Sequence, residues 1–256
     1  MSADPAITAC ADLVQRGDPD RFLATMAAPP AVRPALFTLY AANLEIARAP
    51  WVTSEPMIAQ MRLQFWRNAI ANPANPPAHD IAAPLALLIE EKALPQEPFE
   101  CLIAAREADL ARAPFTDEAA LWAYLEDTAG SLMALALRIF GTSADEVARD
   151  WGAAQGLANY LLAVPALQGA GRLPLPDNRP ETIAALAQTG RARLAQARAS
   201  TKSQPRAARP ALLAAWRAGP LLRQSARYPD RVAQGTLGQS EFTRRLTLLR
   251  ASLTGP

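Results

Sequence analysis

The sequence predicts an all-α fold. Apolar residues recur at helical spacing along nearly the whole chain, and Ala, Leu and Arg, which all favour helices, dominate the composition. The alternating pattern of β-branched residues that marks strands is absent, and Val and Ile are sparse. Half of the 256 residues are hydrophobic and 20% are charged, which is typical of a folded chain with a sizeable core.

Start and stop signals place the expected helices in order. Proline, glycine and polar clusters divide the chain, without a Gly/Ser linker or a repeat, so we expect one domain over residues 1–256. The expected helices cover residues 33–49, 54–71, 80–92, 97–112, 116–141, 143–165 and 177–200, followed by an interruption over 202–210 and two or three shorter helices.

The longest expected helices carry the clearest signals. The helix over 116–141 begins near Thr116, carries Asp117 and Glu118 in its first turn and ends at Gly141, and the small pair Gly130-Ser131 allows a kink or a close helix approach in its middle. In the next helix, Ser143 and Glu146 have the spacing of a capping box, and we expect Pro165 to end the helix.

Several classes of protein are excluded. No apolar stretch reaches the roughly 18–20 residues of a membrane span, and the N-terminus lacks a secretory signal. Two cysteines, Cys10 and Cys101, provide no disulfide framework or zinc spacing, and we expect both to be unreactive. The single histidine, His79, is expected to cap the following helix or lie on the surface. We therefore expect a cytoplasmic protein without a metal site.

Charge is unevenly distributed. Residues 191–256 carry 13 Lys and Arg against two acids, whereas residues 1–190 carry 13 Lys and Arg against 22 acids. A basic segment can contact an anionic membrane, but packing against the acidic remainder of the chain is the favoured interpretation. Stacking aromatic residues are few and widely spaced, so we expect no nucleic-acid partner.

Three segments carry a family resemblance. They are Leu39-Tyr-Ala-Ala-Asn-Leu-Glu-Ile-Ala-Arg48, Arg62-Leu-Gln-Phe-Trp-Arg-Asn-Ala69, and Gly152-Ala-Ala-Gln-Gly-Leu-Ala-Asn-Tyr-Leu162 with Gly171-Arg-Leu-Pro-Leu-Pro176 downstream. In this order and spacing, over about residues 18–180, they resemble the squalene/phytoene synthase family. The resemblance implies an isoprenoid-synthase-type helical bundle around a central cavity.

The resemblance also implies a chemistry that this sequence departs from. The family ionises prenyl diphosphates with Mg²⁺ ions held by two aspartate-rich motifs, because Mg²⁺ requires carboxylate ligands. Here the first motif aligns with Ala47, Arg48 and Trp51, and the second with Ala163, Ala166 and Leu167. We therefore expect no catalytic residues, no metal and no cofactor.

These substitutions resemble one branch of the family, the phytoene-synthase-like assembly factors of respiratory complex I. The resemblance implies a protein that acts by binding in NADH dehydrogenase assembly, with complex I subunits or assembly proteins as partners, at the inner membrane surface. Two alternatives remain open. One is a divergent head-to-head prenyltransferase, for which Mg²⁺ would be needed, and the other is an isoprenoid- or lipid-binding protein.

Ten polar or aromatic residues are candidates for lining the cavity and binding a ligand. Arginine is well suited to anionic head groups, and a polar residue on a buried helix is expected to have a hydrogen-bond partner. The candidates are Tyr40, Asn43, Glu45, Arg48, Arg62, Gln64, Trp66, Arg67, Asn159 and Arg172.

Each candidate has a structural alternative. Glu45 and Arg48 have the spacing of a surface ion pair, and Trp66 is as well suited to the core. Arg62 and Arg67 can pair with Glu45 or Glu55. Asn159 can be a buried structural residue, and Arg172 can belong to a turn.

Overall fold

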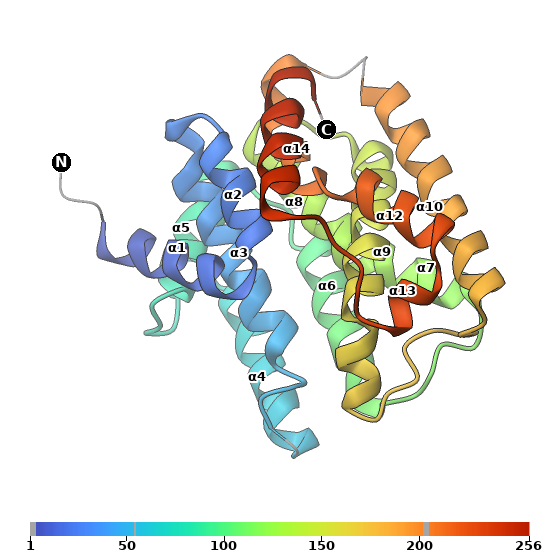
Figure 1. Ribbon diagram of the computed structural model, residues 1–256. Helices are drawn as coiled ribbons and strands as arrows, with labels where there is room; N and C mark the ends of the chain where they lie inside the picture. Colours follow the sequence, from blue (N-terminus) through green and yellow to red (C-terminus); the bar gives the residue numbers. More distant parts are fainter. Residues whose placement is uncertain (1–3, 54, 202–204, 256) are drawn as a thin grey trace.

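The computed structural model describes residues 4–53, 55–201 and 205–255, and it confirms the all-α fold (Figure 1). Among these residues no strand occurs, and short 3₁₀ turns join several of the helices. The α-helices are α1 (Pro5–Gly17), α2 (Pro19–Ala27), α3 (Arg33–Arg48), α4 (Pro56–Ala71), α5 (Ala82–Lys92), α6 (Glu97–Ala108), α7 (Glu118–Leu125), α8 (Ser131–Ile139), α9 (Asp145–Gly169), α10 (Pro180–Thr201), α11 (Arg209–Leu212), α12 (Ala218–Arg227), α13 (Asp230–Ala233) and α14 (Glu241–Thr254).

Most expected helices lie close to their predicted positions. Position 54, where the sequence places the start of the second helix, lies outside the described residues, and α4 begins at Pro56. Part of the expected interruption, residues 202–204, also lies outside them. His79 is exposed, and its Nδ1 accepts a hydrogen bond from the backbone N–H of Ile81 just before α5 (3.1 Å).

Helix α9 is the centre of the bundle. It packs against α7, α8, α10, α12 and α13, and its side chains Trp151, Leu157 and Leu161 are fully buried. One connected apolar core extends from Cys10 to Val232. Helix α9 therefore lies at the centre of this core, and it also forms one side of the cavity described below.

The close helix approach that Gly130-Ser131 predicts in the middle of 116–141 is confirmed. A five-residue π-helical segment, η3 (Glu126–Gly130), separates α7 from α8. Gly152 of α9 lies against it so closely that a Cβ atom there would be 2.4 Å from the carbonyl oxygen of Ala129 and from the Cα of Gly130. The small residues on the two helices thus allow their backbones to touch.

Two predicted signals around α9 are wrong. The helix begins at Asp145, one residue later than the Ser143–Glu146 capping box requires, and the side chain of Asp145 pairs with Arg138 instead (3.0 Å). Pro165 lies inside the helix, which continues for another turn to Gly169.

The end of α9 is set by Gly171 and not by Pro165. The backbone N–H of Arg172 donates to the carbonyl of Leu167 (3.0 Å), and that of Gly171 donates to Gln168 (2.9 Å). Gly171 has a φ of 75°, a left-handed conformation that glycine adopts without strain. This glycine cap fixes the direction in which Arg172 leaves the helix.

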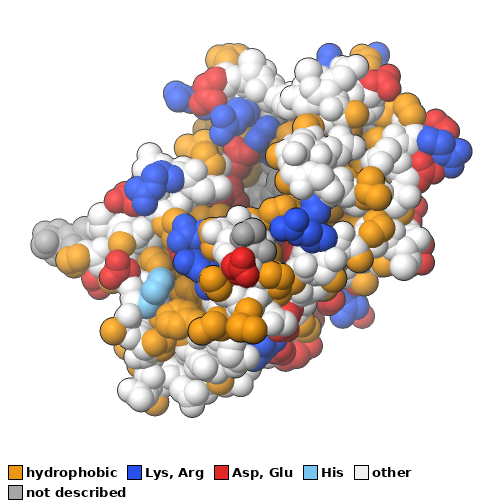
Figure 2. Space-filling model, turned by 90° about the horizontal axis from the view of Figure 1, so that it is seen from below, with side chains coloured by type: hydrophobic (Ala, Val, Ile, Leu, Met, Phe, Trp, Pro, Cys, Tyr) orange, Lys and Arg blue, Asp and Glu red, His pale blue; other side chains and the backbone are white. Residues whose placement is uncertain are grey.

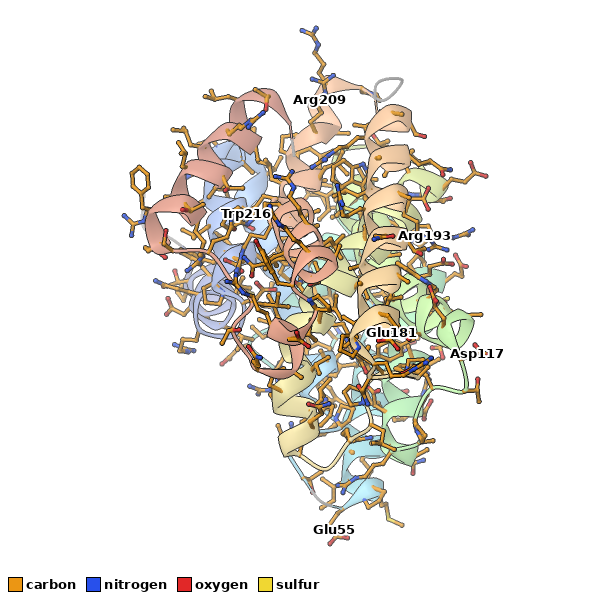
Figure 3. All side chains as sticks on the ribbon, turned by 45° about the vertical axis from the view of Figure 1, so that its right-hand side comes forward. Glu55, Asp117, Glu181, Arg193, Arg209 and Trp216 are labelled. Atoms are coloured by element: carbon orange, nitrogen blue, oxygen red, sulfur yellow. The ribbon has the colours of Figure 1, made fainter. Side chains whose placement is uncertain are left out.

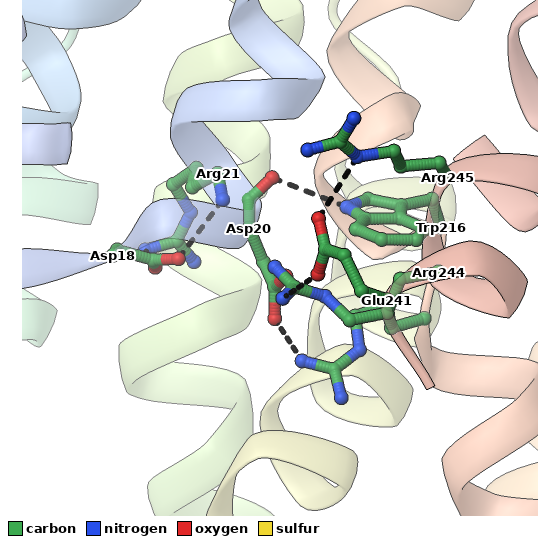
Figure 4. A network of polar contacts seen from close by, with 8 residues as sticks. Asp18, Asp20, Arg21, Trp216, Glu241, Arg244 and Arg245 are labelled. Atoms are coloured by element: carbon green, nitrogen blue, oxygen red, sulfur yellow. Dashed lines mark hydrogen bonds and ion pairs between the residues drawn. The ribbon is translucent and has the colours of Figure 1, made fainter. Parts of the chain in front are cut away.

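Asp20 of α2 joins the N-terminal helices to the C-terminal segment (Figure 4). Its carboxylate pairs with Arg217 and with Arg244 of α14 (2.7 Å to Arg244), and its carbonyl accepts from Trp216 Nε1 (3.1 Å). Trp216 lies among the helices, whereas Arg209 projects from the upper end of the molecule (Figure 3). The basic C-terminal part therefore packs in part on acidic residues of the remainder, as does Arg193 on Glu126 (2.5 Å).

Replacing Gly152 with alanine tests the close approach. Because the added Cβ would overlap backbone atoms of η3, we expect G152A to lower the free energy of unfolding by about 1–3 kcal/mol. Gly169→Ala is the matched control, since a Cβ at Gly169 meets nothing within 4 Å and should change stability by under about 1 kcal/mol. Urea unfolding followed by circular dichroism measures both, and equal midpoints for G152A and the wild type would contradict the contact.

Candidate functional site

A cavity of about 670 Å³ lies between the end of α3, the α7–η3–α8 segment and α9. Its wall is largely apolar, with Leu125, Ala129 and Leu132 on one side and Gly156 and Leu167 of α9 on the other. Gly156 and Ala129 face each other closely, since a Cβ on the glycine would be 2.8 Å from that of the alanine. The volume is within the range of pockets that hold small organic ligands.

A half-buried polar group lines one side of the cavity. Arg106 pairs with the carboxylate of Asp109 (3.3 Å) and contacts the hydroxyl of Tyr124, which itself donates to Asp109 (3.0 Å). Burial raises the pKa of Tyr124 well above its usual value, although the charge of Arg106 opposes this shift. The hydroxyl therefore stays protonated and remains a donor to Asp109.

Two arginines and a tryptophan lie where the cavity adjoins a second, smaller pocket of about 340 Å³. Arg112 and Arg172 line both pockets together with Trp51. The guanidinium of Arg172 stacks on the Trp51 ring at 4.7 Å from its centroid, and Nη1 donates to the carbonyl of Asp109 (2.9 Å). Among the described residues that line the smaller pocket, none carries a carboxylate, so the local charge is positive.

Of the six positions that align with the family's aspartate-rich motifs, four line this cavity, whereas Arg48 and Ala166 lie outside the lining. Ala47 and Trp51 line it from the end of α3, and Ala163 and Leu167 line it from α9. Among the described lining residues, Asp109 carries the one carboxylate, and Arg106 already pairs with it. These side chains do not fit a Mg²⁺–diphosphate cluster, which needs several carboxylate oxygens.

Three of the ten candidate residues line the cavity. Asn43 enters it from α3, Asn159 from α9, and Arg172 from the turn after α9. Tyr40 is buried one turn before Asn43, with Arg21 over its ring at 5.0 Å, and it is Arg21 that reaches the cavity. Burial raises the pKa of Tyr40 to about 12, so its hydroxyl stays protonated.

The other six candidates lie outside the lining. Glu45 and Arg48 form the ion pair that their spacing allows (2.7 Å). Trp66 is in the core, in edge-on contact with Phe65 and His79. The six are Glu45, Arg48, Arg62, Gln64, Trp66 and Arg67.

Arg67 does not pair with Glu45 or Glu55. It binds Glu100 (2.8 Å) and Glu107 (3.1 Å), because α6 packs beside α4. Glu55 lies at the lower tip of the molecule and points outward (Figure 3).

The sequence interpretation missed the residues that give the cavity its polarity. Arg106, Asp109 and Tyr124 come from two segments that only the fold brings together, and Arg112 follows in a turn of left-handed φ (54°). Their one sequence signal is a cluster of charges over 106–112, which looks like an ordinary exposed helix end.

The face around the α3–α4 connection carries exposed apolar side chains interspersed with arginines (Figure 2). Trp51, Val52, Met57, Ile58 and Met61 are all exposed there. Within the described part of the chain, no helix is long and apolar enough to cross a membrane.

Comparison with known proteins agrees with the fold and the motifs. The family model for squalene/phytoene synthase matches residues 14–179. A human protein named "NADH dehydrogenase (ubiquinone) complex I, assembly factor 6" is 30% identical over 161 residues, which cover 61% of this chain and 48% of that protein. Its Drosophila melanogaster homolog is 32% identical over 178 residues, covering 65% and 52%. The chain thus spans about half the length of these curated relatives.

Solved structures with the same fold include enzymes. A dehydrosqualene synthase in complex with ligand superposes with a TM-score of 0.78 at 15% identity, covering 97% of this chain and 95% of that one. Squalene synthase HpnC from Alicyclobacillus acidocaldarius gives 0.72 at 17% identity, covering 91% and 95%. At these identities the likeness shows the fold alone. The family match, which extends over more than half of the sequence, shows that this chain belongs to the squalene/phytoene synthase family.

Proposed function

We propose that this protein acts by binding, without prenyl-transfer chemistry, in the assembly of a respiratory NADH dehydrogenase. The observation that carries the proposal is the composition of the cavity wall. Ala47, Trp51, Ala163 and Leu167 occupy the places where the family's Mg²⁺ ligands belong, and Arg112 and Arg172 add positive charge nearby. A positively charged wall repels divalent cations instead of holding them.

The relatives supply the biological role. Both the human and the Drosophila melanogaster proteins carry a complex I assembly factor name, at 30% and 32% identity over 61% and 65% of this chain. Assembly of a multi-subunit enzyme requires binding surfaces and no covalent chemistry. The proposed role is therefore compatible with a fold whose metal-binding residues have been replaced.

The divergent prenyltransferase alternative has less support. The acids that would have to replace the missing motifs are engaged elsewhere, since Glu45 pairs with Arg48 and Glu126 pairs with Arg193. Asp127 lies beside Glu126 on η3 and is absent from the cavity lining.

Deleting the gene from its own organism separates the two functions. We expect membranes of the deletion strain to lose most of their NADH:quinone oxidoreductase activity, with isoprenoid products unchanged. The purified wild-type protein should release no pyrophosphate from farnesyl diphosphate with Mg²⁺. Normal oxidoreductase activity in the deletion strain, or pyrophosphate release above a no-protein control, would overturn the proposal.

Binding of an isoprenoid or lipid is a second candidate function, favoured by the cavity itself. Its apolar wall is suited to a hydrocarbon chain, and Arg112 and Arg172 at one end are suited to an anionic head group. Such a ligand needs no bridging metal, because guanidinium groups bind phosphate oxygens directly.

Farnesyl diphosphate is a suitable probe for this second function. In isothermal titration calorimetry we expect it to bind equally well with EDTA and with Mg²⁺. Ala163→Phe should weaken binding by about tenfold or more, because the ring would occupy the cavity. Ala166→Phe, one turn further along α9 at an exposed position outside the lining, is the control and should bind like the wild type. Binding that requires Mg²⁺, or that survives A163F, would count against the ligand site.

A further inference from the structure

The outer face of α14 exposes an apolar stripe. Phe242 is 78% exposed, Leu246 54%, Leu249 56% and Leu253 77%. The opposite face holds the helix to the body of the protein, since Arg244 pairs with Asp20, and Leu248 and Ala251 pack in a small core cluster with Trp216. The stripe is therefore a free surface on a helix whose other side is already anchored.

The stripe has the spacing of a coiled-coil seam. Its residues are separated by four, three and four positions, which is the d-a-d-a pattern of a heptad repeat. In this register Arg245 occupies position g and Arg250 position e, the two positions that border the seam. Both arginines are exposed, and the pairing of Arg245 with Glu241 (2.9 Å) is a surface contact that a partner can replace.

We propose that the outer face of α14 docks an amphipathic helix of another protein, one with an aliphatic stripe bordered by Asp and Glu. The stripe would supply the apolar contact, and Arg245 and Arg250 would pair with the acidic borders. This inference rests on the proposed function, for which it supplies a surface that can hold an assembly partner.

A second copy of this chain fits the surface less well. In a parallel pair of helices, position g of one lies beside position e of the other, which places Arg245 against Arg250. In an antiparallel pair, g lies beside g and e beside e, so that with the two stripes fully overlapped Arg245 lies beside Ser252 and Arg250 beside Thr243, and no ion pair forms. The parallel pair repels and the antiparallel pair gains no ion pair, whereas an acidic helix is complementary in both orientations.

The narrowness of the stripe favours a helix over a lipid surface. An interfacial helix buries a broad apolar face, whereas an a/d-only stripe is typical of a helix–helix seam. On α14 the stripe is bordered directly by polar side chains, Thr243 and Arg250 on one side and Arg245 and Ser252 on the other. The four apolar residues extend over about 17 Å of helix, a small contact that suits a transient partner.

Designed peptides provide the test with the full-length protein. The acidic probe is a fluorescein-labelled 21-residue helix with Ile and Leu at positions a and d and Glu at e and g, and the basic probe has Lys at e and g. In fluorescence anisotropy we expect the acidic probe to bind about tenfold or more tightly than the basic one, with the difference shrinking at high salt. Equal binding of the two probes, or no binding of either, would overturn the proposal.

Two variants connect the binding to α14. L246D/L249D removes two exposed leucines and should abolish acidic-probe binding, while circular dichroism and the melting temperature stay near those of the wild type. R245E/R250E should reverse the preference between the probes. Unlike the leucine variant, it keeps the apolar stripe, so a reversal cannot arise from unfolding. If L246D/L249D bound the acidic probe as tightly as the wild type does, the stripe would be excluded as the binding site.

Vesicles and complementation distinguish the remaining outcomes. If vesicles of phosphatidylglycerol and phosphatidylcholine bind the protein through Leu246 and Leu249 while the acidic probe does not, α14 is a membrane surface and the proposal fails. A strain producing L246D/L249D should show reduced NADH:quinone oxidoreductase activity. If the full deletion leaves that activity normal, the proposed function fails even where the peptide result holds. If the deletion lowers the oxidoreductase activity but L246D/L249D restores it fully, the docking proposal fails and the proposed function stands.

Discussion

The backbone contact between α9 and η3 is the constraint on which the cavity depends. At Gly152 the backbones of α9 and η3 are so close that even a Cβ atom would not fit between them. This contact fixes the separation of the two cavity walls that η3 and α9 form. One turn further along, Gly156 and Ala129 line the cavity from the two sides of this contact. The π-helical turn helps to make it possible, because it interrupts the regular helix where the glycine must fit. The shape of the cavity therefore follows from small residues, independently of any chemistry that the cavity performs.

Because the shape of the cavity does not depend on the side chains that line it, those side chains can differ while the fold stays the same. The side chains of Ala47, Trp51, Ala163 and Leu167 line a space that the helix backbones define, so an exchange between a carboxylate and an apolar residue there changes the cavity wall at little cost to packing. The half-buried polar group is different, because Arg106, Asp109 and Tyr124 hydrogen-bond to one another. Removing one of them would leave its partners without these hydrogen bonds, each of which contributes about 1 kcal/mol.

Sequence reasoning found the features that depend on local chemistry and missed those that depend on distant segments. Helix α3, the break at Gly130-Ser131 and the pair of Glu45 with Arg48 follow from propensity and spacing within a few residues. Pro165 was misleading because the proline is accommodated inside the helix, and the glycine cap at Gly171 determines the end instead. The partners of Arg67 are 33 and 40 residues away, and no local pattern identifies them. The exposed stripe of α14 likewise depends on a distant contact. Arg244 pairs with Asp20, 224 residues away, and this ion pair turns the opposite face of the helix toward the protein.

Helix α2 supports the cavity and the outer surface at once. Arg21 stacks on Tyr40 and lines the cavity, while the adjacent Asp20 holds α14 through Arg244 (Figure 4). Because α14 is fixed by this ion pair and by the packing of Leu248 and Ala251, its exposed stripe is presented in an ordered helix. A partner helix then loses only its own conformational freedom on docking, which lowers the entropic cost of a small interface. Through Arg21 and Asp20, helix α2 thus gives the cavity and the outer face of α14 a common support.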